Sequence, residues 1–172
     1  MSNLQRNLIN AALFQLGWFA CVFGAQRPWL LLVAASCLLA HLFWLSHGWR
    51  EWRLIAAVTL FGCVLDSLLL NLGLFNFPGD SPLLPLWLAL LWALFASTLE
   101  HCLQWTARHV WLGMLCGAVA GPLSYYGGAQ IAGVGLPLGN LTTLLLLACI
   151  WAGVMAVILG LRRTGLGAFP QP

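Results

Sequence analysis

Six apolar stretches follow one another along the chain, each close to the ~20 residues that a helix needs to cross a hydrocarbon core. Short groups rich in Pro, Gly, Arg or His separate most of them, as at Arg27-Pro28 and 77–82. The pattern predicts six transmembrane helices, over residues 7–25, 28–46, 53–73, 82–104, 109–127 and 140–161. The stretch 127–139 has no charge, so it extends the fifth helix, forms a short loop or re-enters the membrane.

The composition supports a membrane location for all of these helices. Charged residues make up 6% of the chain and apolar residues 62%, whereas soluble domains have roughly 25% charged residues. We therefore expect an all-α, polytopic membrane helix bundle, and residues 1–172 form one domain because no hydrophilic block is long enough to fold separately. The few charges are too scattered for a nucleic-acid-binding surface, so no nucleic-acid partner is expected.

The arginines indicate the orientation of the bundle. All seven basic Lys or Arg residues are Arg, and with six spans and a cytoplasmic N-terminus only Arg27 lies on the far side. The other six lie on the cytoplasmic side, as the positive-inside rule requires; they are Arg6, Arg50, Arg53, Arg108, Arg162 and Arg163. Both termini are therefore expected in the cytoplasm.

Polar residues inside the spans are candidates for function because they are costly in hydrocarbon. Asn7 and Asn10 share one stripe of the first helix, and Glu100 and His101 lie near the inner end of the fourth. If these faces converge, they form a polar cluster on the cytoplasmic side, with His41 as a further member. Glu100 and His101 are then candidate catalytic, proton-handling residues, and the two asparagines are candidate ligand contacts. The alternatives are hydrogen bonding between helices for the asparagines and snorkelling towards water for the other two.

The fifth segment has a glycine face followed by a proline. Gly113, Gly117 and Gly121 recur every four residues, and such overlapping GxxxG steps let another helix approach closely. Pro122 lacks a backbone donor and can bend the helix just before its polar residues.

The two tyrosines of the chain, Tyr125 and Tyr126, lie beyond this proline, next to Ser124. Asp66 lies near the middle of the third segment, and Asn71 follows it towards the outer end. We expect a water- or ligand-filled polar cavity lined by Asp66, Asn71, Ser124 and at least one tyrosine. The alternative is that the tyrosines form part of an outer aromatic belt.

Motifs for metals, cofactors and nucleophilic catalysis are missing from the sequence. The six cysteines fall one per predicted helix without CxxC or Cys/His spacing, and they are expected to be packing residues. There is no Gly-rich phosphate loop, GxSxG or HExxH motif. We expect no metal and no cofactor.

Several blocks of the chain together resemble a known family. They are Asn7 and Asn10 before the stretch 14–19 (FQLGWF), Asp66, the stretch 92–96 (WALFA) before Glu100-His101, and 121–128 (GPLSYYGG). This combination resembles a bacterial family of small inner-membrane proteins known only as a domain of unknown function. The resemblance implies a multi-pass protein of the bacterial inner membrane and no established activity. Members of that family are often encoded near genes for fatty-acyl or cyclopropane-lipid modification. The resemblance therefore favours a lipid as the ligand or substrate.

Three kinds of function fit these observations. In the first, the polar faces line a cavity open to lipid, and the protein binds or modifies an acyl lipid or a similar amphiphile. In the second, the protein is a small transporter or flippase with Asp66 as its coupling site, although its two halves do not match as an inverted repeat. In the third, it is a non-catalytic membrane subunit that docks a partner through its glycine face.

Overall fold

The structure, a computed structural model, describes residues 1–78 and 84–163. Within these residues the chain is all-α, with one isolated bridge between Asn76 and Gly135. The α-helices are α1 (Asn3–Gly24), α2 (Leu30–Ala40), α3 (Trp49–Asn71), α4 (Leu86–Ala96), α5 (Val110–Ala132) and α6 (Asn140–Leu161). A π-helix, η1 (His41–Leu45), continues α2, and a 3-10 helix, η2 (Gln104–Ala107), precedes α5. The predicted all-α bundle is confirmed in this form.

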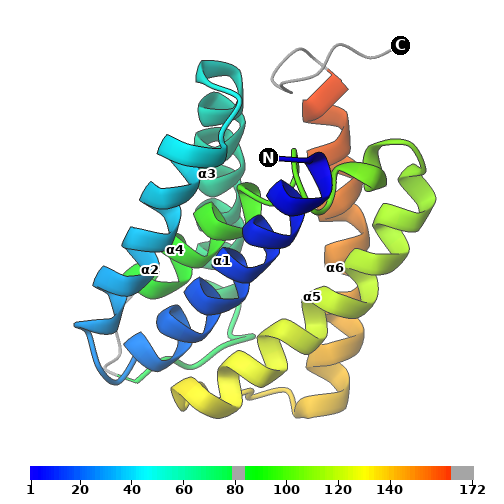
Figure 1. Cartoon of the computed structure of the whole chain (residues 1–172). Helices are drawn as coiled ribbons and strands as arrows, with labels where there is room; N and C mark the ends of the chain where they lie inside the picture. The colour runs from blue at the N-terminus through cyan, green and yellow to red at the C-terminus, as the bar shows by residue number, and fades with distance from the viewer. Residues whose placement is uncertain (79–83, 164–172) are drawn as a thin grey trace.

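Successive helices run in alternating directions, so that the N-terminus and the end of α6 lie at the same end of the bundle (Figure 1). Three of the described helices, α1, α3 and α6, are long and apolar enough to cross a membrane. The apolar helices Leu30–Leu45 and Leu86–Ala96 are shorter. These lengths and compositions indicate a membrane protein.

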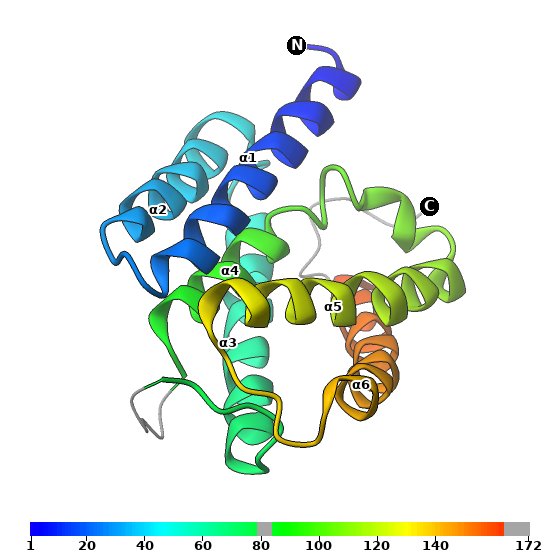
Figure 2. The ribbon, with the colours of Figure 1, turned by 90° about the horizontal axis from the view of Figure 1, so that it is seen from below.

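Helix α4 occupies a central place among the others. It packs against α1, α2 and α3, and the view from below shows α1 beside α2 and α5 beside α6, with α4 between α1 and α3 (Figure 2). Residues at both ends of α4 can therefore reach several helices at once.

The predicted fourth span, 82–104, is wrong in its second half. Helix α4 ends at Ala96 and, with 11 residues, is about 16 Å long, roughly half of a hydrocarbon core. The hydroxyls of Ser97 and Thr98 donate to the carbonyls of Leu94 and Phe95 at 2.7 and 2.6 Å, which offers the last turn an alternative to further helix. Residues 97–101, which follow α4 outside any α-helix, are buried inside the protein, where membrane proteins tolerate such backbone.

The glycine face of α5 packs directly on α6. Gly113, Gly117 and Gly121 are all buried, and a Cβ atom on Gly117 would lie 2.4 Å from Met155 Cγ and 2.9 Å from the Trp151 carbonyl oxygen. The prediction of a close helix approach at these glycines is confirmed. Pro122 lies inside α5 without ending it.

The uncharged stretch 127–139 divides into helix and loop. Helix α5 continues to Ala132 and ends at Gly133, whose φ of 73° suits glycine. The loop that follows pairs with the segment after α3, where Asn76 and Gly135 exchange backbone hydrogen bonds of 3.0 and 2.8 Å. Most of the predicted break over 77–82 lies outside the described residues.

Candidate functional site

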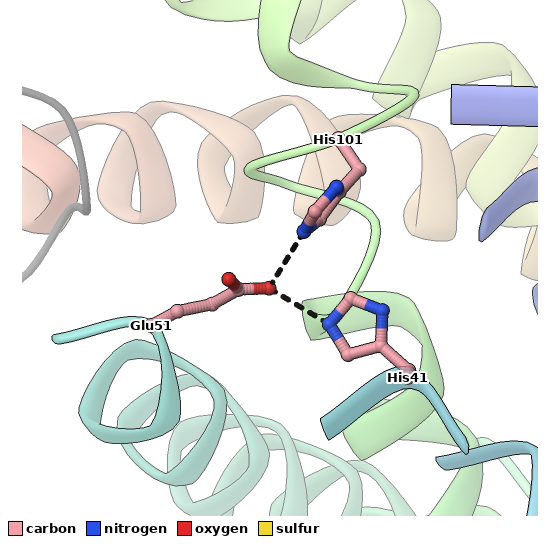
Figure 3. A group of neighbouring side chains, drawn as sticks. All are labelled: His41, Glu51 and His101. Carbon is pink, nitrogen blue, oxygen red and sulfur yellow. Dashed lines mark hydrogen bonds and ion pairs between the residues drawn. The ribbon is translucent and has the colours of Figure 1, made fainter. Parts of the chain in front are cut away.

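Glu51 lies at the centre of a buried polar cluster that the sequence did not single out. It stands in the first turn of α3, where a negative charge interacts favourably with the helix dipole, and its exposure is 0%. Gly48, with φ of 94°, forms the turn between η1 and α3. This turn brings the start of α3 beside η1, so that Glu51 faces His41 (Figure 3).

Three histidines surround the Glu51 carboxylate, and together they form what we call the Glu51 cluster (His41, His47, Glu51 and His101). The Nε2 atoms of His41 and His101 lie 2.7 and 3.0 Å from Glu51 Oε1. The backbone N–H of His47 donates to Glu51 Oε2 at 2.6 Å, and His47 Nδ1 lies 3.2 Å from the same oxygen. Burial lowers the pKa of His47, which favours the neutral imidazole.

Asn10 holds His41 in place from α1. Its amide nitrogen lies 3.1 Å from His41 Nδ1 and donates to the Ser97 carbonyl oxygen at 3.1 Å. Because an amide nitrogen is a donor only, His41 Nδ1 accepts here and the ring proton lies on Nε2, facing Glu51. The predicted meeting of Asn10, His41 and His101 is confirmed, whereas Asn7 is half-buried and outside these hydrogen bonds.

Glu100 and His101 point to different partners, although they are adjacent in sequence. His101 faces Glu51, while Glu100 accepts a hydrogen bond of 2.8 Å from Arg162 Nε. Glu100 and Arg162 are 2% and 6% exposed, so they form a buried ion pair that joins the segment after α4 to the end of α6. The expectation that Glu100 belongs to the same polar cluster as His101 and Asn10 is therefore wrong.

The second buried carboxylate of α3 is Asp66. Trp92 Nε1 donates to its Oδ2 at 2.6 Å, and the Tyr125 hydroxyl lies 2.7 and 2.8 Å from its two oxygens. We call these three residues the Asp66 cluster. Asp66 is 0% exposed, which confirms that it faces the interior and lies beside one tyrosine, in direct contact.

Gly62 makes room for this arrangement. It lies one turn before Asp66 on α3, and a Cβ atom there would stand 2.0 Å from the Trp92 ring. Trp92 also stacks on Trp151 of α6, with ring centroids 5.2 Å apart and planes 4° from parallel. The indole is therefore held on both faces while its N–H points at Asp66.

A cavity of about 500 Å³ lies between α1, α4, α5 and α6. Its wall is mainly apolar and aromatic and includes Phe14, Trp18, Phe95, Trp151 and Met155. The polar residues at this wall are Gln15, Thr106, Ser124 and Tyr125.

The cavity opens at the surface of the bundle. Leu123 at its rim is 60% exposed, and the lining residues Gln15 and Cys116 are exposed as well. These residues belong to α1 and α5, so the opening lies between these two helices. Trp18 Nε1 donates to Ser124 Oγ at 2.8 Å and joins the two helices there.

The predicted polar cavity is therefore only partly correct. Ser124 and Tyr125 line the cavity, and Asp66 lies behind Tyr125 rather than at its wall. Asn71 is exposed and donates to the Ser67 carbonyl within its own helix at 2.7 Å. Its position near the end of α3 turns it away from the bundle. Tyr126 is half-buried and does not line the cavity.

Comparison with known proteins gives the family of the chain and no activity. A family model described as a protein of unknown function (DUF2878) matches residues 7–157. The chain belongs to this family. No curated protein and no solved structure gives a significant match. The predicted membership in a family of unknown function is confirmed, and the family adds no activity to what the geometry shows.

Sequence reasoning missed three residues that organise these sites, namely His47, Glu51 and Trp92. The one local signal is an acidic residue, Glu51, in the first turn of α3, where a carboxylate commonly accepts a backbone N–H that precedes the helix. Trp92 lies among apolar residues of a predicted span, so the sequence did not show that its indole N–H donates to Asp66.

Proposed function

We propose that this protein is a multi-pass membrane protein that binds an acyl lipid or a similar amphiphile in the cavity between α1, α4, α5 and α6. The observation that carries the proposal is the cavity itself, with apolar walls, a few polar groups and an opening between α1 and α5. Its volume of about 500 Å³ lies within the ~300–1,000 Å³ typical of small-molecule sites.

The cavity wall has an apolar region and a polar region, which match the two parts of an amphiphile. Phe14, Phe95 and Met155 offer surface to a hydrocarbon chain. Ser124 accepts a hydrogen bond from Trp18, which leaves the hydroxyl proton of Ser124 for an acceptor on the ligand. The Tyr125 hydroxyl points at Asp66 and can accept a hydrogen bond from a ligand with its own oxygen.

The proposal includes six spans with both termini in the cytoplasm of a bacterial cell. The helices run in alternating directions, and the start of α1 lies at the same end of the bundle as the end of α6 (Figure 1), which supports this topology. The excess of arginine expected on one side supports it as well. A reporter that is active only in the periplasm should give no signal when it is fused to Pro172. Strong activity of that fusion would contradict the topology.

Lipid binding can be tested with a photoreactive lipid that carries a diazirine on its acyl chain. Trp151 and Met155 line the cavity and are only 8% and 3% exposed, so adducts on them report entry of the chain. Lipid that merely coats the bundle should label exposed residues such as Leu141 and Leu145, which are 72% and 61% exposed.

A matched pair of variants sharpens the test. Ala120 lines the cavity, whereas the neighbouring Val119 does not and is 55% exposed. Ala120→Trp should fill the opening and abolish labelling of Trp151 and Met155, and Val119→Trp should leave it unchanged. Labelling confined to exposed residues in the unaltered protein would refute the proposal.

A further inference from the structure

We propose that His41, Glu51 and His101 bind a divalent transition-metal ion, with His47 in contact with two of these ligands. One ligand atom from each of the three residues lies within 4.8 Å of the other two, and all three residues are buried. They come from η1, the first turn of α3 and the segment after α4, and their side chains converge on one point (Figure 3). This proposal is independent of lipid binding in the cavity.

The separations suit a metal ion after small side-chain movements. Zinc lies about 2.0–2.2 Å from imidazole nitrogen and carboxylate oxygen, so neighbouring ligand atoms of a tetrahedral site are about 3.3 Å apart. The two nitrogen–oxygen distances here are 2.7 and 3.0 Å. These two distances need to widen by about 0.3–0.6 Å to match those bond lengths, and the two nitrogen atoms, which lie within 4.8 Å of each other, need to come no more than about 1.5 Å closer.

The donor set also has a defined chemistry. Two imidazoles and one carboxylate form the protein ligands of several catalytic zinc sites and of non-haem iron(II) sites, and they leave positions open for water or substrate. The His47 ring stacks on His101 with centroids 4.7 Å apart, and its side chain is 30% exposed. His47 is therefore the most exposed member of the Glu51 cluster.

The backbone around His41 supports a specialised site. The backbone N–H of Ser46 donates to the carbonyl oxygen of His41, five residues earlier, at 2.9 Å. This hydrogen bond closes a π-helical turn. Such turns are rare in proteins and are frequently found at functional sites. Here the turn follows the last residue of α2 and begins with His41, one of the three proposed metal ligands.

Metal binding must also change the hydrogen bonds of Asn10. An ion on His41 Nε2 moves the ring proton to Nδ1, which then needs an acceptor. The Asn10 amide nitrogen, which now faces Nδ1 and donates to Ser97, has to give way to the amide oxygen. Binding of the ion is thereby linked to the contact between α1 and the segment after α4.

The test uses the full chain in detergent, without an oligohistidine tag, after removal of metals by a chelator. Zn²⁺ should bind with one ion per chain and raise the Tm. Co²⁺ should give the intense visible absorption of a four-coordinate nitrogen and oxygen site. Glu51→Gln and His101→Gln should weaken Zn²⁺ binding by more than about 100-fold, beyond the 10–100-fold expected for outer partners.

His109→Ala is the matched control, because His109 is exposed and lies outside the Glu51 cluster. It should bind Zn²⁺ as the unaltered chain does. Size-exclusion chromatography and metal-free unfolding establish whether each variant folds, and if Glu51→Gln does not, the stoichiometry and Co²⁺ spectrum of the unaltered chain decide. Lack of stoichiometric Zn²⁺ uptake by the unaltered chain, or equal uptake by folded Glu51→Gln and His101→Gln, would overturn the proposal.

Discussion

Two carboxylates of α3 are completely buried, and they have different neighbours. Glu51 and Asp66 are fifteen residues apart, about 22 Å along a helix at ~1.5 Å per residue, and both are 0% exposed. Glu51 is contacted by three histidines, whereas Asp66 is contacted by an indole and a phenol. The burial is the same, so the partners decide what each carboxylate can do.

Because their partners differ, Asp66 has a positioning role, whereas Glu51 has partners that can take part in chemistry. An indole N–H is a fixed donor that neither accepts a hydrogen bond nor binds a metal through nitrogen. Asp66 therefore serves as an acceptor that holds Trp92 and directs Tyr125 at the cavity wall. Imidazoles change tautomer, take up protons and bind metals, so the Glu51 cluster has chemistry available to it that the Asp66 cluster lacks.

The largest effect is expected for Asp66→Ala. The change leaves the buried Trp92 N–H and Tyr125 O–H without their acceptor, and each unsatisfied donor costs about 1–3 kcal/mol, so we expect a loss of about 2–6 kcal/mol. Unfolding in mixed detergent micelles measures this free energy. The exposed Asn71→Ala is the control and should change stability by less than about 0.5 kcal/mol. Equal losses in the two variants would show that Asp66 is not a structural acceptor.

A smaller loss, about 1–3 kcal/mol, is expected for Gly62→Ala because the new methyl group overlaps the Trp92 ring. The ring then has to move away from Asp66 and give up its hydrogen bond. Gly153→Ala on α6 is the matched control, since a Cβ atom there meets nothing within 4 Å. That variant should be stabilised by up to about 1 kcal/mol. Similar behaviour of the two variants in thermal unfolding would contradict the packing described here.

Glu51→Gln should cost less, about 1 kcal/mol without metal, the net value of one hydrogen bond. The glutamine oxygen still accepts from His41 and His101, whereas its amide nitrogen faces the His47 backbone N–H, so that one hydrogen bond is lost. Asp66→Asn should cost less still, because its amide oxygen can accept from Trp92 Nε1 while its amide nitrogen donates to the Tyr125 hydroxyl oxygen. Measuring the free energies of unfolding of both isosteric variants tests this difference between the Glu51 cluster and the Asp66 cluster. A larger loss for Asp66→Asn than for Glu51→Gln would contradict these hydrogen-bond assignments.

The smallest effect is expected for His47→Ala, below about 1 kcal/mol in metal-free protein. Its side chain is 30% exposed, so water can replace the hydrogen bond of the His47 ring to Glu51. The backbone N–H of residue 47 continues to donate to Glu51. A loss as large as that of Asp66→Ala in the same unfolding assay would place His47 among the core residues instead.

The sequence could predict much of the fold because hydrophobic length and helical periodicity act locally. The apolar composition indicated a membrane bundle, the four-residue glycine spacing predicted a close approach of another helix to α5, and Asp66 was expected inside with a tyrosine. Each of these follows from properties of one helix, since an apolar environment penalises any outward-facing carboxylate and only glycine permits so close a contact.

The tertiary structure alone decided which polar residues meet. Helix α4 stops at Ala96, so that His101 turns to Glu51 and Glu100 turns to Arg162 on α6. The three proposed metal ligands are 10 and 50 residues apart along the chain, a spacing that has no meaning within a single helix. Their convergence depends on where a helix ends, how a π-helical turn is closed and how distant helices cross. Those are long-range packing interactions, which the periodicity of a sequence does not encode.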